Sequence, residues 1–433
     1  MRHHLAAALA VLLAAAGPAA HAAPRTPTDD HEVIERLPAR LPGAGPRRTA
    51  AAQRLALHEA SSANLPLALA LARQAIEQAR ASGDPRDWGQ AQAALAPWWA
   101  ADAPPAAVRL LRATIRQGQH DFAAALADLD AVLAAAPREA PASLRRAAWH
   151  GRGSADDALA LRAQAELTRA SIHQVQGRYA LAREGCERLA GPGYAALGES
   201  AQVPAKAYLA ELGQLQGRLG AREADARLAA LGPAGDPWLA LLRAELAQRS
   251  GLPGAEALFR AATAGAQPGL YALAARADWL LDQGRPREAA TLLAGRDAAD
   301  ALMLRRVIAE RRLLGARVGP AGVPPALRRD VADLQARFEA ALVRGDRSHA
   351  REQARFMLDV LGDAAAALPL AQANWAWQRE PADALLLLRA AAAAGQPAAA
   401  APARQWATGQ GFGDVRWPRL PAGNATTLQR STT

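Results

Sequence analysis

Metal binding and acid–base catalysis need His, Cys, Asp or Glu side chains held at short, regular spacing. The histidines that follow residue 22 are instead scattered along the chain, at His31, His58, His120, His150, His173 and His349. They form no His-Glu-x-x-His motif, and no two of them lie four residues apart. The single cysteine, Cys186, stands on an alanine-rich segment, where we expect a small buried side chain. We therefore expect no metal and no cofactor.

Two glycine-rich stretches are of the kind that binds phosphate or presents a nucleophile. Gly409–Asp414 reads Gly-Gln-Gly-Phe-Gly-Asp, but no strand precedes it and no clear helix follows it, so a flexible stretch is the better interpretation. Residues 151–154 read Gly-Arg-Gly-Ser, but Ser154 lacks the glycine two residues further on that a nucleophile elbow needs. Neither stretch predicts a catalytic site.

The dipeptide Glu199-Ser200 resembles the start of the catalytic motif of soluble lytic transglycosylases, which are exported enzymes with a helical superhelix. In that family a Gly-Leu-Met-Gln motif follows, and this sequence has none. A general acid also needs a pocket that raises its pKa, and the residues after Ser200 return to helical repeats. We expect the chain not to be an enzyme, and a transglycosylase-like enzyme stays as an alternative.

The first 22 residues have the order of a secretory signal peptide. A basic start, Met1–His4, precedes the apolar run Leu5–Ala16, which is too short to be a permanent membrane anchor. Ala20-His21-Ala22 then places small residues where a signal peptidase reads them. We expect cleavage after Ala22, no stable membrane span, and a periplasmic or secreted protein.

The composition favours helices and argues against nucleic acid. Apolar residues make up 51% of the chain but aromatic residues only 4%, because alanine, the best helix former, supplies much of the apolar content. The net charge is +10, yet the basic residues, all arginine except Lys206, alternate with Asp and Glu and form no run of five. Such a pattern is typical of solvated helix faces, so we expect no nucleic-acid partner.

A helix–turn–helix unit recurs along the chain. Turn residues such as Gly177-Arg178-Tyr179 and Gly284-Arg285-Pro286 separate two segments with helical periodicity. A small residue then recurs at one position of each second helix, at Ala68, Ala125, Ala182, Ala224, Ala255, Ala289, Ala350 and Ala384. Ala255 and Ala289 are 34 residues apart, as are Ala350 and Ala384.

This unit resembles the tetratricopeptide repeat (TPR), which is about 34 residues long, and the chain is more loosely similar to periplasmic repeat proteins of Gram-negative bacteria. The resemblance implies an all-α fold, an irregular α-solenoid of antiparallel helix pairs over residues 46–410. We expect a linker at 23–45, an insertion near 138–160 and a disordered tail at 411–433. Wider gaps between the repeated alanines are expected to contain extra helices, such as Gly89–Trp99 and Ala301–Leu314, or degenerate repeat units.

In the repeat family, the first helix of each unit lines a concave groove that binds peptides or a partner's helix. The resemblance places these residues in that groove: Gln164, Ser171, Gln174, Tyr271, Asp278, Asp282, Gln335, Glu339 and Trp377. The family's chaperone-binding clamp has Asn at positions where this chain has Thr114, Ser171, Asp278 and Ala373, so that kind of carboxylate recognition is not expected.

The tryptophans allow two interpretations. Trp98-Trp99 and the pair Trp375 and Trp377 stand among small residues, where they fill the space that alanine leaves between helices. The alternative is a binding hot spot or a platform for sugar rings. The sequence as a whole predicts a non-catalytic periplasmic scaffold for protein partners, with a role in envelope assembly or export. The alternative is a peptide- or glycan-binding module.

Overall fold

The computed structural model is helical throughout the part of the chain that it describes, residues 64–135, 155–233, 235–266, 268–315, 322–343 and 349–417, in which no strand occurs. These residues belong to a unit that begins at His58. The predicted signal peptide (1–22) and linker (23–45) lie outside them. No described helix is long and apolar enough to cross a membrane, and no described group of three or more His, Cys, Asp or Glu side chains is placed to hold a metal ion.

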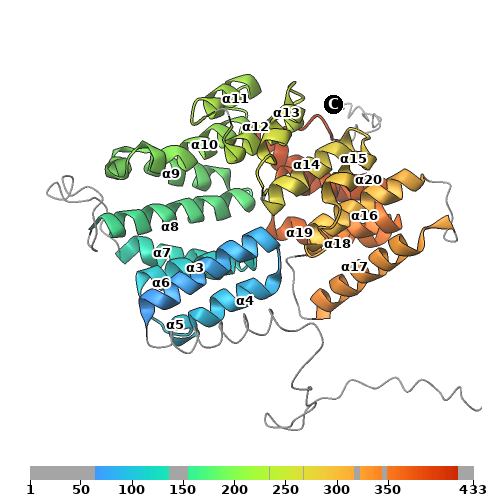
Figure 1. Cartoon of the computed structure of the whole chain (residues 1–433). Helices are drawn as coiled ribbons and strands as arrows, with labels where there is room; N and C mark the ends of the chain where they lie inside the picture. Colours follow the sequence, from blue (N-terminus) through green and yellow to red (C-terminus); the bar gives the residue numbers. More distant parts are fainter. Residues whose placement is uncertain are drawn as a thin grey trace, which may run out of the picture. The chain divides into compact units, whose positions relative to one another are not determined.

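Helices that are neighbours in the chain pack against each other in pairs (Figure 1). The pairs are α3 (Leu65–Ser82) with α4 (Pro85–Ala94), α6 (Ala106–Gly118) with α7 (Phe122–Ala135), α8 (Ala155–Val175) with α9 (Tyr179–Ala190), α10 (Glu199–Leu215) with α11 (Ala221–Ala229), α12 (Pro237–Ser250) with α13 (Ala255–Ala262), and α14 (Leu270–Asp282) with α15 (Pro286–Leu293). A short helix, α5 (Ala96–Trp99), joins the first pair to the second.

Less regular helices complete the chain. They are α16 (Asp300–Leu314), α17 (Pro325–Val343), α18 (Ala350–Arg355), α19 (Ala364–Trp377), α20 (Pro381–Ala393) and α21 (Ala401–Gln410), with a π-helical turn (Phe356–Leu361) directly after α18. The extra helices expected from the wide alanine gaps are present as α4, α5 and α16.

The repeated alanines lie where helices meet, although Ala68 lies on α3, the first helix of its pair, and not on a second helix as expected. All of them except Ala350 are buried, with exposed fractions between 0 and 9%. A buried alanine allows two helices to approach closely, and larger apolar side chains fill the space next to it, as Leu129 does in the cluster that contains Ala125. Cys186 is fully buried, as expected, and burial raises the pKa of its thiol to about 12.

A row of turns with left-handed backbone runs along the pairs. Each turn joins the two helices of a pair at Gly83, His120, Gly177, Gly217, Gly251 and Gly284, where φ lies between 60 and 70°. We call this row the turn edge. Glycine adopts this conformation without steric cost, whereas His120 is the one described residue other than glycine that has a positive φ.

Two expected boundaries differ from the structure. Helix α8 begins at Ala155, so the last residues of the predicted 138–160 insertion are helical, and 138–154 lie outside the described residues. The tail predicted from 411 to 433 begins too early, because Gly411–Trp417 packs against the repeats. Phe412 is buried with an exposed fraction of 6%, since it can fill an apolar site between helices. The interpretation of Gly409–Asp414 as a flexible stretch is therefore wrong as well.

Two candidate binding cavities

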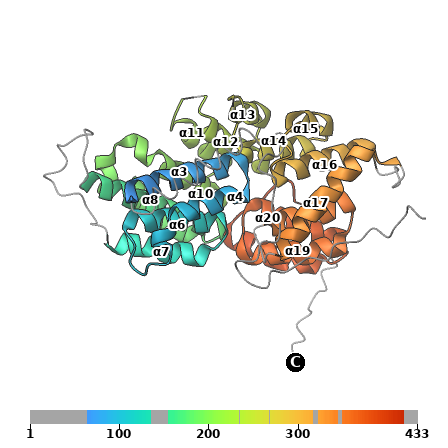
Figure 2. The same ribbon diagram turned by 60° about the horizontal axis from the view of Figure 1, so that its bottom comes forward.

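The C-terminal segment of the chain runs along the turn edge. Trp406 Nε1 lies 3.4 Å from the carbonyl oxygen of Gly177, and the Val415 amide donates to the carbonyl oxygen of Arg249 at 3.0 Å. Further upstream, the Arg379 amide donates to the carbonyl oxygen of Val175 at 2.8 Å. Figure 2 shows α19 and α20 beside the N-terminal helices, from which they are far apart in sequence.

Glycine at the turn edge permits this approach. A methyl group on Gly177 would lie 2.7 Å from Trp406 Nε1, and one on Gly217 would lie 2.9 Å from the carbonyl oxygen of Gly411. These separations are too short for a real contact, so the glycines serve close packing as well as backbone conformation. Three of the six turns, at Gly177, Gly217 and Gly251, are therefore covered by C-terminal residues of the chain.

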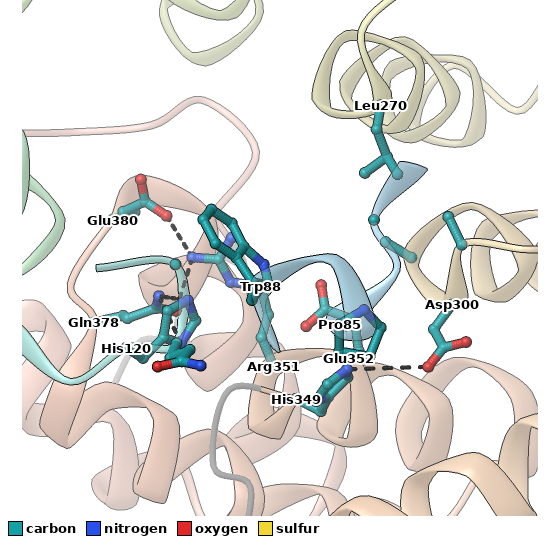
Figure 3. A pocket seen from close by; sticks show the side chains of 15 residues that line it. Pro85, Trp88, His120, Leu270, Asp300, His349, Arg351, Glu352, Gln378 and Glu380 are labelled. Carbon is teal, nitrogen blue, oxygen red and sulfur yellow. Dashed lines mark hydrogen bonds and ion pairs between the residues drawn. The ribbon is translucent and has the colours of Figure 1, made fainter. Parts of the chain in front are cut away.

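One cavity remains where the first repeats meet the C-terminal half, and we call it the junction cavity. Its volume is about 630 Å³, within the range of small-molecule and side-chain binding sites. Figure 3 shows its walls. The lining residues are Gly83, Pro85, Trp88, Gly118, Gln119, His120, Leu270, Ala299, Asp300, Ala301, His349, Arg351, Glu352, Gln378 and Glu380.

His120 forms part of the wall of the junction cavity. Its ring stacks on Phe122 with centroids 5.4 Å apart, and its Nε2 lies 3.3 Å from Nε2 of Gln378, 258 residues further along. Holding a residue other than glycine in the left-handed region costs about 1–2 kcal/mol. Such strain is found mostly where a side chain has a function. At His120 this backbone conformation places an imidazole where the other turns have the hydrogen atom of a glycine.

Apolar surface is concentrated on the N-terminal wall of the junction cavity. The indole of Trp88 lies against Gly118, where a methyl group would come within 2.4 Å of the ring. Leu270 packs against Gly83 in the same manner, with its Cδ1 2.6 Å from the place of such a group. Trp88 is half-buried, so part of its ring faces the cavity.

Acidic groups dominate the opposite wall. The charge of Arg351 is neutralised by Asp383, 2.6 Å from its Nε, and by Glu380. Asp300 pairs with Arg337 at 2.8 Å. Glu352 is half-buried and lines the same wall. Burial raises the pKa of Glu380 although Arg351 opposes the shift. The cavity therefore has three carboxyl groups near an aromatic ring, of which those of Asp300 and Glu380 pair with Arg337 and Arg351.

A second cavity of about 130 Å³ lies against the first helices of successive pairs, and we call it the central cavity. It shares Arg351 and Glu380 with the junction cavity. Its lining residues are Gln174, Tyr179, Glu211, Leu215, Glu245, Gln248, Arg249, Tyr271, Ala274, Ala275, Asp278, Arg305, Arg351, Glu380, Pro381, Ala382 and Arg416.

Three of the predicted groove residues meet in the central cavity. Gln174 Nε2 donates to Glu211 at 2.9 Å, and the Tyr271 hydroxyl donates to Glu245 at 2.7 Å. Burial raises the pKa of Glu245 to about 7. Burial also opposes the ionisation of Asp278, but the guanidinium groups of Arg305 and Arg355 prevail and lower its pKa to about 2.

The other predicted groove residues do not converge there. Ser171 receives a hydrogen bond from Gln117 at 3.2 Å, and Asp282 receives one from Gln248 at 2.9 Å. Gln335 donates to Glu339 at 2.9 Å on the exposed face of α17. Gln164 donates a hydrogen bond to Thr168 on its own helix. Both Gln164 and Trp377 are exposed and line neither cavity.

The tryptophan prediction is confirmed in part. Trp375 is buried and Trp98 and Trp99 are half-buried within clusters of apolar side chains, whereas 47% of Trp377 is exposed. Glu199, at the start of α10, is exposed and lines neither cavity.

Sequence reasoning missed the junction cavity. None of its lining residues was among the predicted groove residues, because they come from six separate stretches of the chain. One signal was available in the sequence: His120 stands where the repeat pattern has a turn glycine. No family model, no curated protein and no solved structure matches this chain.

Proposed function

We propose that this chain is a non-catalytic scaffold of the tetratricopeptide type, exported to the periplasm, which binds protein partners through the junction cavity. The irregular solenoid of helix pairs over 46–410 remains the architecture that best accounts for the consecutive pairs and for the turn edge. The sequence of residues 1–22 supports export. The setting we propose is envelope assembly or export machinery.

The observation that carries this proposal is the combination of Trp88 with Asp300, Glu352 and Glu380 around one open cavity. The face of an indole ring and nearby carboxylates together suit a Lys or Arg side chain, whose methylene stem packs on the ring while its charge meets the acids. We therefore propose that the partner presents a basic side chain.

The non-catalytic part of the proposal is supported by the position of Glu199. This residue is exposed at the first turn of α10, so no enclosed site surrounds it. Release of soluble muropeptides from cell-wall material by the purified protein, and its loss in Glu199→Gln, would overturn this part.

Photocrosslinking in intact cells tests the partner site. A photoreactive amino acid at Gln119 faces the junction cavity, and one at the exposed Ala336 on α17 is the matched control. We expect a specific adduct from position 119 only, lost in Glu352→Lys and retained in Glu339→Lys. Identical adducts from both positions, or an adduct indifferent to Glu352→Lys, would contradict the proposed site.

A glycan-binding module is the second candidate, since a half-exposed tryptophan beside carboxylates also suits a sugar ring. Its test is thermal unfolding of the purified protein with soluble cell-wall oligosaccharides, because a ligand that binds only the folded state raises the melting temperature. A rise that is absent in Trp88→Ala would favour this candidate over the protein partner.

A further inference from the structure

The central cavity contains buried polar atoms that lack a hydrogen-bond partner among the described residues. They are the hydroxyl of Tyr179, Nη2 of Arg249 and Oε1 of Gln174. Tyr179 is 1% exposed and Arg249 is 4% exposed, and both side chains line the cavity. Leaving such groups unsatisfied costs about 1–3 kcal/mol each. Their convergence on one small space therefore points to a polar molecule that occupies it.

The side chain of Arg249 is held in place by one hydrogen bond, but its hydrogen-bonding capacity is not fully used. Its Nε donates to Gln214 at 2.8 Å, and its carbonyl oxygen accepts from Val415. Its Nη2 lies 3.4 Å from Glu211, an ion-pair separation that does not complete a hydrogen bond. One edge of the guanidinium thus remains available to an anionic group in the cavity.

Glu245 supplies the opposite charge. It lies one helical turn before Arg249 on α12, a spacing at which Glu and Arg commonly pair. The two side chains form no ion pair. Among the described residues, Glu245 accepts a side-chain hydrogen bond from the Tyr271 hydroxyl. Glu211 and Glu380 also border the cavity. A cation placed there would have several carboxylates within reach, while Arg249 faces the same space.

The volume limits the ligand to a small molecule. About 130 Å³ is well below the 300 Å³ at which sites for drug-sized molecules begin. It exceeds several times the roughly 10–15 Å³ that one buried water needs. The cavity therefore has room for a handful of non-hydrogen atoms that carry one negative and one positive group.

We propose that the central cavity binds a free α-amino acid with a small side chain. Its carboxylate accepts hydrogen bonds from Arg249 Nη2 and the Tyr179 hydroxyl, and its ammonium donates to Glu245 and to Oε1 of Gln174. The four residues assigned to this site do not line the junction cavity, although the two cavities share Arg351 and Glu380, so the amino-acid site and the proposed partner site can be tested independently.

Isothermal titration calorimetry on the purified full chain tests this site with glycine, L-alanine and L-serine as probes. Glycinamide, which lacks the carboxylate, and acetate, which lacks the ammonium, are the matched controls. We expect at least one of the amino acids to bind about tenfold or more tightly than either control, because both charges must be met. Heats no larger than those of the controls for all three probes would mean that the cavity holds water only, and would overturn the proposal.

Tyr179→Phe separates ligand binding from folding. The hydroxyl has no hydrogen-bond partner in the part of the chain that the structure describes, so its removal should leave the melting temperature unchanged or slightly higher. The affinity for the bound amino acid should nevertheless fall about tenfold, the value of a lost hydrogen bond to a charged group. Tyr194→Phe, another buried tyrosine that does not border the central cavity, is the control. Equal affinities of Tyr179→Phe and the unmodified protein would contradict the assignment.

Discussion

The turn edge has two parts that differ in what covers them. From Gly177 to Gly251, C-terminal residues lie directly on the turns, with Trp406, Gly411 and Val415 each beside a glycine. At His120 a side chain occupies that position, and the junction cavity remains open beside it. The comparison indicates that one backbone conformation serves two purposes: glycine allows the chain to close on itself, and His120 holds a space open.

The junction is also where a buried ion-pair network replaces apolar contact. Arg351 lies between the two cavities and pairs with Asp383, whose side chain is fully buried and also accepts from Asn374 at 2.7 Å. Burial opposes the charge on Arg351, but the carboxylates hold its pKa well above the ordinary value. The open part of the turn edge is therefore held together by ion pairs, and the covered part by close packing.

Removing Arg351 should have the largest effect. Arg351→Met leaves Asp383 buried without its cation, which should lower the free energy of unfolding by about 3–5 kcal/mol in urea denaturation. Arg260→Met removes an exposed pair with Glu256 and should change it by less than about 1 kcal/mol. Similar losses in the two variants would mean that the buried network does not hold the junction.

The pH dependence of stability tests the environment of Glu245, which lines the central cavity. The pKa of Glu245 is raised to about 7 in the folded state, above the value near 4.5 expected in the unfolded chain. The folded state thus binds more protons between pH 4.5 and 7, and stability should fall by up to about 3 kcal/mol as pH rises through that window. Thermal unfolding between pH 5 and 8 should show the decline in the unmodified protein and a smaller one in Glu245→Gln. Identical profiles would show that Glu245 ionises normally.

Glycine substitutions compare the covered edge with an open turn. Gly177→Ala and Gly284→Ala impose the same backbone strain, because their φ angles are 70 and 67°. The added methyl group collides with Trp406 and Arg379 at Gly177 but meets nothing within 4 Å at Gly284. We expect Gly177→Ala to be less stable than Gly284→Ala by about 1–3 kcal/mol in urea denaturation. Equal stability would contradict the close approach of the C-terminal segment.

His120→Gly should have the smallest effect on stability. Relief of the left-handed strain and loss of the contact with Gln378 oppose each other, so the free energy of unfolding should change by about 1 kcal/mol or less. The crosslink from Gln119 should weaken nevertheless, because the cavity wall changes. A loss of more than about 2 kcal/mol would show that His120 is a structural contact rather than part of a site.

The helices and turns could be predicted from the sequence because their signals are local. Alanines at one position of each unit and glycine after the first helix of a pair recur within about 34 residues, and the structure confirms that all but one of the repeated alanines are buried. The burial of Phe412 could not be predicted, since a single aromatic residue in a stretch of Gly, Gln and Asp gives no periodic pattern.

The cavities were only partly predictable for a related reason. Gln174, Tyr271 and Asp278 were placed by their position on first helices, and the structure brings them to one cavity. Trp88 and Glu352 come together only because residues far apart in sequence pack across the junction, as the contact between His120 and Gln378 illustrates. No spacing rule within a single chain reports such a contact.

Hydrogen–deuterium exchange of the C-terminal segment tests the central claim most directly, which is that the chain covers its own turn edge. The amides of Phe412 and Val415 donate to the carbonyl oxygens of Ala407 and Arg249, so a peptide spanning 406–417 should exchange slowly in the unmodified protein. Phe412→Ala removes the buried side chain that anchors the segment and should make the peptide exchange fast while α12 stays protected. Fast exchange of 406–417 in the unmodified protein would contradict the closure of the turn edge by the C-terminal residues.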